Sequence, residues 1–161
     1  MSIPEIPTER ALPLAELTLA NLHEVLALVE RPPAPTEEML ATRLTPRHYA
    51  AAHLVIVRDL LEKEFPLPSM GGENATMISR GSVLFLLKPR IRELSAFIVQ
   101  VKNGAPPSPT DCGRILLIIA VAVVSLLAAK ETFPQISPDG DGKEVAKVGM
   151  TDAAGFRGPS Q

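Results

Sequence analysis

Tryptophan is absent from this chain, cysteine and tyrosine occur once each, and aromatic residues make up 4% of the 161 positions. So few rings exclude an aromatic core and predict one built from Leu, Val, Ile and Ala. The lone Cys112 excludes an intramolecular disulfide and favours a reducing compartment or indifference to redox. Met1–Arg10 has acids and prolines but no apolar run, so we expect no secretory signal peptide.

A large net charge is also lacking, because the formal total is only −2. That total hides an uneven distribution along the chain. Residues 1–42 hold seven acids and two bases, residues 43–114 hold ten bases and six acids, and residues 115–161 hold four bases and five acids. An acidic first part and a basic middle suit head-to-tail self-association or an anionic partner, and ordinary solvated faces are the alternative.

Groups for nucleophilic or metal chemistry are few and scattered. Cys112 would need a histidine and an orienting acid to act as a nucleophile, and no signature surrounds His23, His48 or His53. His48 and His53 are five residues apart, which places them on different faces of a helix. Asp139–Gly142 has alternating acids but lacks the later Glu of a calcium loop. We therefore expect no enzyme, no metal site and no cofactor.

Proline is abundant, with 16 residues, and it divides the chain into parts. Residues 1–15 carry three prolines and are predicted to form an extended arm. Residues 16–133 are predicted to form one all-α domain of about five helices, and residues 134–161, which lack periodicity, an irregular tail. Thr18 is the predicted cap of the first helix.

Helical spacing and end signals place the individual segments. We expect a helix over 18–30 and a short one from Thr36 onwards. Three further helices are expected over 46–64, 75–87 and 109–129, each preceded by a capping residue, namely Thr45, Asn74 and Ser108. Residues 90–101 form either a further helix or a kinked continuation beyond Pro89. The Gly71-Gly72 pair marks a hinge or turn between two of these segments.

The most informative segment is Ile115–Ala129, fifteen residues without a charge between Arg114 and Lys130. As a helix it is about 22 Å long, short of the roughly 30 Å of a bilayer core. It is therefore a buried core or subunit-interface helix, a membrane segment within 112–130, or, with its six β-branched residues, a buried strand. The residues expected at such an interface or membrane are Ile115, Leu116, Leu117, Ile118, Ile119, Val121, Val123, Val124, Leu126 and Leu127.

Basic residues gather around Pro89, namely Arg80, Lys88, Arg90 and Arg92. They are candidates for contacting phosphate, which would make nucleic acid a partner. Because no aromatic residues interleave with them, base stacking is not supported. The alternative is a solvated face with internal salt bridges.

These features together predict a non-enzymatic structural or interaction subunit of a large assembly, such as a coat, virion or filament. Its partners would be copies of itself or other subunits, with the terminal segments packing on neighbours. The alternative is a small single-pass membrane-anchored protein, or an accessory subunit of a membrane complex, using residues 112–130. We accordingly expect a non-secreted location, within a large particle or at a membrane.

Overall fold

The computed structural model describes residues 3–67 and 80–128 and contains five helices. Their bounds are α1 Thr8–Glu30, α2 Glu37–Thr42, α3 Pro46–Glu62, α4 Arg80–Lys102 and α5 Pro109–Leu127. They hold 77% of the described residues, and no strand occurs in those two ranges. The all-α prediction is confirmed, and the strand alternative for residues 115–127 is wrong because they lie in α5.

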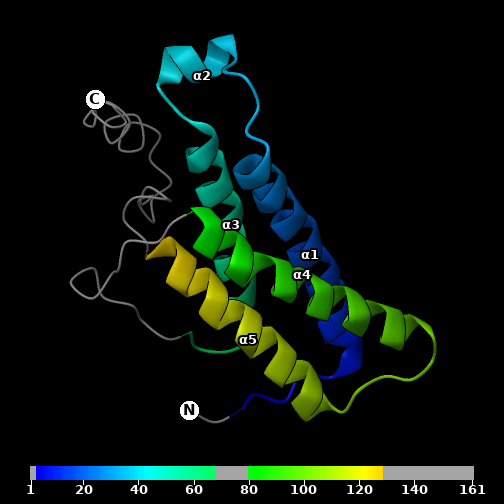
Figure 1. Cartoon of the computed structure of the whole chain (residues 1–161). Coiled ribbons are helices and arrows are strands. Elements are labelled where there is room, and N and C mark those ends of the chain that lie inside the picture. The colour runs from blue at the N-terminus through cyan, green and yellow to red at the C-terminus, as the bar shows by residue number, and fades with distance from the viewer. Residues whose placement is uncertain (1–2, 68–79, 129–161) are drawn as a thin grey trace.

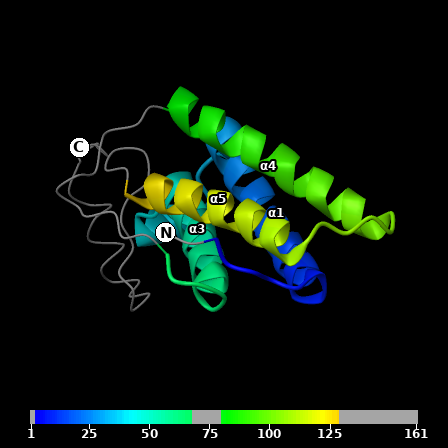
Figure 2. The ribbon, with the colours of Figure 1, turned by 90° about the horizontal axis from the view of Figure 1, so that it is seen from below.

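Four of the helices form a bundle, and α2 projects from one end of it (Figure 1). Helix α1 contacts α3, α4 and α5, and α5 also contacts α3 and α4. Figure 2 shows α5 lying between α3 and α4, across α1. Ion pairs tie the helices at their edges: Arg10 to Glu64 at 3.3 Å, and Glu16 to Lys102 at 2.9 Å.

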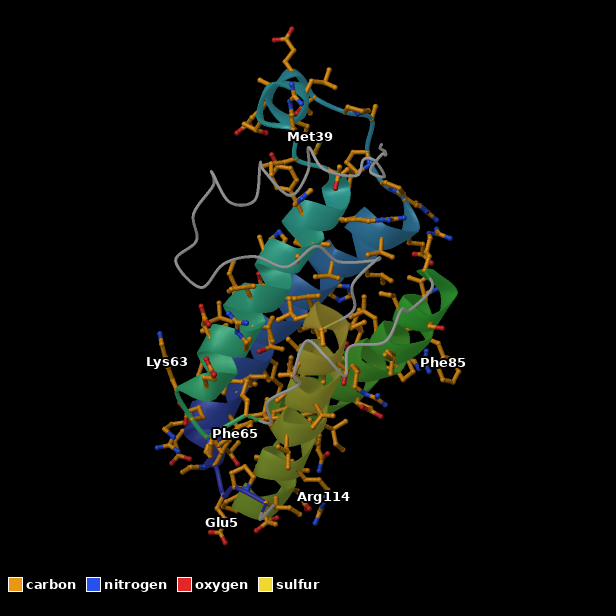
Figure 3. The ribbon with its side chains drawn as sticks, turned by 90° about the vertical axis from the view of Figure 1, so that its left-hand side faces the viewer. Glu5, Met39, Lys63, Phe65, Phe85 and Arg114 are labelled. Carbon is orange, nitrogen blue, oxygen red and sulfur yellow. The ribbon has the colours of Figure 1, made fainter. Side chains whose placement is uncertain are left out.

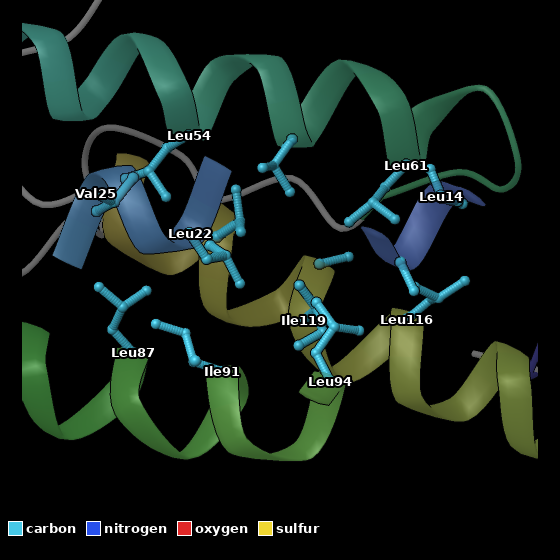
Figure 4. Packing of buried hydrophobic residues seen from close by; sticks show 14 of the residues in the cluster. Leu14, Leu22, Val25, Leu54, Leu61, Leu87, Ile91, Leu94, Leu116 and Ile119 are labelled. Atoms are coloured by element: carbon cyan, nitrogen blue, oxygen red, sulfur yellow. The ribbon is translucent and has the colours of Figure 1, made fainter. Parts of the chain in front are cut away.

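The core of the bundle is aliphatic, as the composition predicts. Side chains from all four helices meet in it, and Figure 4 shows Leu22, Leu54, Leu94 and Ile119 converging. All four are at most 1% exposed. Phe97 is the one aromatic side chain among the largest fully buried residues that the structure describes.

The predicted extended arm over residues 1–15 is wrong from residue 8 onwards, because α1 begins at Thr8, while residues 3–7 do lie outside a helix. Pro13 lies inside the helix and removes one backbone hydrogen bond, which ordinarily favours a break. Packing offsets that loss, since Ala11, Leu14 and Ala15 are buried on the face that meets the other helices. Thr18 is therefore a fully buried residue within α1, and its predicted role as a cap is also wrong.

Residues 3–7, here called the N-terminal strap, pack on their own chain. The Ile6 side chain is 1% exposed, and its backbone N–H donates to the Pro109 carbonyl oxygen at 3.0 Å. The carbonyl of Pro4 lies so close to Gly113 that a Cβ added there would overlap it. This segment therefore covers the start of α5 within the same molecule, and its packing on a neighbour stays a prediction.

Local end signals predict the other helices well. Thr36 Oγ1 accepts from the Met39 N–H at 3.1 Å, and Ser108 Oγ accepts from the Asp111 N–H at 3.1 Å. Pro46 occupies the first turn of α3, behind Thr45. Helix α4 continues through Pro89, so residues 90–101 continue the same helix and do not form a separate one. The Gly71-Gly72 hinge, the Asn74 cap and the tail over 134–161 lie outside the described residues.

The contact between the strap and α5 predicts that Gly113→Ala changes the free energy of unfolding in opposite directions in chains with and without the strap. In the full chain the added methyl should lower the free energy of unfolding by about 1–3 kcal/mol, because Pro4 leaves no room. In a chain without residues 2–5 it should instead raise it by up to about 1 kcal/mol, because Ala favours a helix more than Gly. Urea unfolding of the four chains measures both changes. A shift of the same sign in both backgrounds would contradict the contact.

Candidate interaction surfaces

Helix α5 carries the ten apolar residues that the sequence singles out, and the bundle divides them by face. Leu116, Ile119, Val123, Val124 and Leu126 are buried. Ile115, Leu117 and Leu127 are partly buried and pack against the core. Ile118 and Val121 are 41% and 44% exposed. The helix is therefore a core helix that keeps a narrow apolar strip on its outer side.

Helices α1 and α5 are both long and apolar enough to cross a membrane by length and composition. Half of the most apolar window of α5, and a third of that of α1, is buried inside the bundle. The outer strip of α5 also begins at the exposed Arg114, whose guanidinium is 2.6 Å from Asp111 Oδ1. Entry of α5 into lipid would therefore require it to leave α1, α3 and α4 with their apolar faces uncovered.

Three of the four predicted phosphate-contacting residues bind groups of this chain. Arg80 donates to the carbonyl oxygens of Val29 at 2.9 Å and Glu30 at 2.6 Å, which satisfies the end of α1. Lys88 Nζ is 2.7 Å from Glu30 Oε2, and this hydrogen bond lowers the pKa of Glu30 below its usual value.

The other two bases lie further along α4. Arg90 holds both carboxylate oxygens of Glu93, at 2.7 and 2.9 Å. Arg92 is exposed, and no ion pair joins it to another residue of the described ranges. These contacts support the alternative of a salt-bridged face, and phosphate binding stays a prediction.

The most exposed large apolar side chains lie outside α5. Eight such residues in the described ranges are at least 39% exposed: Ile3, Leu17, Leu40, Ile56, Phe85, Val99, Ile118 and Val121. The highest values are 78% for Phe85 in α4 and 68% for Leu40 in α2. Neither was a candidate on sequence grounds. The signal for Phe85 is periodicity, because the buried stripe of α4 contains Val83 and Leu87 and therefore leaves Phe85 on the outer side.

The α2 surface consists of Glu37, Leu40 and Ala41, which share one side of a helical turn. Helix α2 has no buried residue, and the proline-rich segment 31–36 before it is exposed throughout. Figure 3 shows α2, marked by Met39, standing at one end of the molecule. The α2 surface is therefore an apolar side chain beside an acid, presented clear of the bundle.

The α4 outer surface consists of Phe85, Lys88, Arg92 and Val99, which recur at helical spacing on the exposed side of α4. Phe85 points away from the ribbon in Figure 3. Val99 is 56% exposed and Lys88, despite its contact with Glu30, keeps 45% of its side chain accessible. This surface therefore combines apolar area with the positive charges of Lys88, which Glu30 of α1 partly neutralises, and Arg92.

Comparison with known proteins adds no relative. No protein-family model, no curated protein and no solved structure matches the chain.

The reactive side chains are distributed without a common site. Cys112 is buried, and burial raises the pKa of its thiol above the usual value, which makes it a poor nucleophile. His53 Nδ1 donates to Asn21 Oδ1 at 2.8 Å and so links α3 to α1. No three His, Cys, Asp or Glu side chains within residues 3–67 and 80–128 are grouped to hold a metal ion.

The titration of His48 is shifted by its surroundings. Its Nδ1 accepts from the Thr45 N–H at 2.9 Å, which caps α3 and leaves the proton of the neutral ring on Nε2. Nε2 is buried without a hydrogen-bond partner among the described residues. Burial therefore lowers the pKa of His48 from 6.5 to about 4.

This shift predicts an acid-sensitive fold. Between pH 6.5 and about 4 the unfolded chain takes up a proton at His48 that the folded chain excludes, so stability falls as the pH falls. The loss should reach up to about 3 kcal/mol and level off below pH 4. His48→Gln keeps a capping side chain without the titration and should flatten this part of the profile. His23→Gln, at an exposed position, is the control and should retain the wild-type slope.

A lysine at two positions of α5 distinguishes a core helix from a membrane span. Val123→Lys places a charge at a 1% exposed position and should cost more than about 3 kcal/mol of unfolding free energy. Val121→Lys, at a 44% exposed position, should change it by no more than about 0.5 kcal/mol. Both positions lie in the middle of the uncharged segment 115–129, so either lysine would weaken the insertion of a membrane span to the same extent. Equal losses in urea unfolding would contradict the core position of α5.

Proposed function

We propose that this chain is a non-enzymatic structural subunit that assembles with copies of itself, as in a coat, virion or filament. The observation that carries the proposal is α2, a helix without one buried residue that projects from a bundle whose core closes without it. A six-residue helix is marginal by itself, and ordering it against a partner would stabilise it. A neighbouring subunit supplies such a partner.

The exposed apolar side chains give the same proposal an energetic basis. Burying a Leu or Phe side chain contributes about 1.5–3 kcal/mol. Most of this free energy is still to be gained at Leu40 and Phe85 when a partner covers them, since they are 68% and 78% exposed in the isolated chain. Single exposed apolar residues are common on soluble proteins, so their exposure alone does not support the proposal. Their location supports it, because Leu40 lies on a projecting helix and Phe85 lies beside basic residues of α4.

The non-enzymatic part of the proposal is supported by the state of the reactive groups. The Cys112 thiol is buried with a raised pKa, and the His48 ring is occupied in capping α3. The two lie on different helices, and within the described ranges His48 bonds to Thr45 and Cys112 contacts Thr8, neither of which is an acid. Nucleophile, base and orienting group need hydrogen-bond contact with one another, and these side chains do not provide it.

Membrane anchoring is the second candidate, and the apolar character of α5 and α1 is the observation that favours it. It ranks below assembly because α5 would have to give up its buried contacts. Leu116, Ile119 and Leu126 are 0% exposed, and each contributes about 1.5–3 kcal/mol in the bundle. Lipid would have to replace these contacts and leave the faces of α1, α3 and α4 to water.

Sedimentation of the full chain at increasing concentration, without detergent, tests the proposal. We expect the mean mass to rise with concentration, because the exposed surfaces associate. Flotation with vesicles of neutral and anionic lipid should leave the protein unbound in the same experiment. A monomer at every concentration would contradict the proposal, and co-flotation of the folded chain would favour the membrane candidate.

A further inference from the structure

We infer that the copies join head to tail, with the α2 surface of one subunit docking on the α4 outer surface of the next. The inference rests on the proposed function and gives it a specific contact. The two surfaces carry the two most exposed large apolar side chains of the described chain, Leu40 and Phe85. Each therefore offers the other an apolar partner of the kind that it lacks in the isolated molecule.

The charges around these two side chains are opposite. Beside Leu40 lie Glu37 and Glu38 in the first turn of α2, and the nearest base is the exposed Arg43 at the other end of the helix. Beside Phe85 on the exposed side of α4 lie Lys88, which is paired with Glu30, and Arg92, while the nearest acid along the helix, Glu93, is held by Arg90. No ion pair joins Glu37, Glu38 or Arg92 to another described residue. Opposed potentials of this kind guide association and fix its register.

The spacing of the groups also matches. Glu37 lies three residues before Leu40, and Lys88 lies three residues after Phe85, so acid and base are each about 4.5 Å along the axis from the apolar side chain. Helix α2 is about 9 Å long, close to the roughly 10 Å between Phe85 and Arg92. An antiparallel or crossed arrangement would bring Leu40 onto Phe85 and Glu37 towards a base at the same time.

The position of the surfaces determines the kind of assembly. Helix α2 stands at one end of the molecule and Phe85 lies on the outer side of α4 (Figures 1 and 3). When the contact is made once between two copies, each copy keeps one free surface, and repetition of the contact produces a ring or an open filament. When it is made twice between the same two copies, it closes a two-fold dimer, so the mass of the assembly tells the two arrangements apart.

Two single variants test the docking. Leu40→Glu removes the α2 surface and keeps the α4 outer surface, and Phe85→Glu does the reverse. Both positions are mostly exposed, so circular dichroism and melting temperature should match the wild type. Each variant alone should be a monomer at concentrations where the wild type assembles. An equimolar mixture should form a heterodimer and nothing larger, because only one productive contact remains.

Matched controls make each outcome decisive. Leu17→Glu places the same charge at an exposed leucine of α1, 53% exposed, and should assemble like the wild type. Glu37→Arg and Arg92→Glu should each weaken association at least about tenfold, since like charges would then face each other, and the double variant should recover most of that loss. The double variant also covers the case in which a glutamate variant fails to fold.

The outcomes separate the two proposals. Wild-type protein that stays monomeric would overturn both the assembly and its contact. Wild-type assembly that persists in Leu40→Glu or Phe85→Glu would overturn the docking and leave the proposed function standing. Folded single variants that are monomeric but form no heterodimer on mixing would also overturn it, because the remaining pair of surfaces should still bind.

Discussion

Burial of the inner face of α5 is the interaction on which the rest of the structure depends. Leu116, Ile119, Val123 and Leu126 fill the space between α1, α3 and α4, and all are at most 1% exposed. The same helix anchors the N-terminal strap through Pro109 and Gly113. Core packing and membrane insertion therefore compete for one set of side chains. Because the inner face of α5 is buried in the bundle, the apolar residues left for a partner are exposed ones such as those of its narrow outer strip, of α2 and of the outer side of α4.

The parts of the fold that depend on local chemistry could be predicted from the sequence. Thr36 and Ser108 cap helices with their own side chains within three residues, so the pattern alone contains the information. The start of α1 could not be predicted in this way. Pro13 and Thr18 follow local rules for a break and a cap, but buried Ala11 and Leu14 draw the chain into the helix through contacts with distant segments.

The candidate surfaces show the same limit more clearly. A run of fifteen uncharged residues indicates a buried helix, but the sequence does not separate Ile118 from Ile119. Packing against three neighbouring helices leaves Ile118 exposed and buries Ile119. The basic residues around Pro89 suggest phosphate, yet Arg80 satisfies the carbonyls of Val29 and Glu30, fifty residues earlier in the chain. Periodicity reveals which face of α4 is buried, while only the fold shows which charges are already paired.

Fold stability does not require Leu40 or Phe85 to be apolar. Neither contributes to the core, and a polar residue at either position would cost the bundle little. One exposed leucine and one exposed phenylalanine are common on soluble domains and need no special explanation. Fold stability also does not explain the charges without an ion pair among the described residues, which are Glu37 and Glu38 near Leu40 and Arg92 near Phe85. A heterologous contact uses both properties at once, because the apolar pair supplies affinity and the opposite charges exclude an α2-to-α2 or α4-to-α4 pairing.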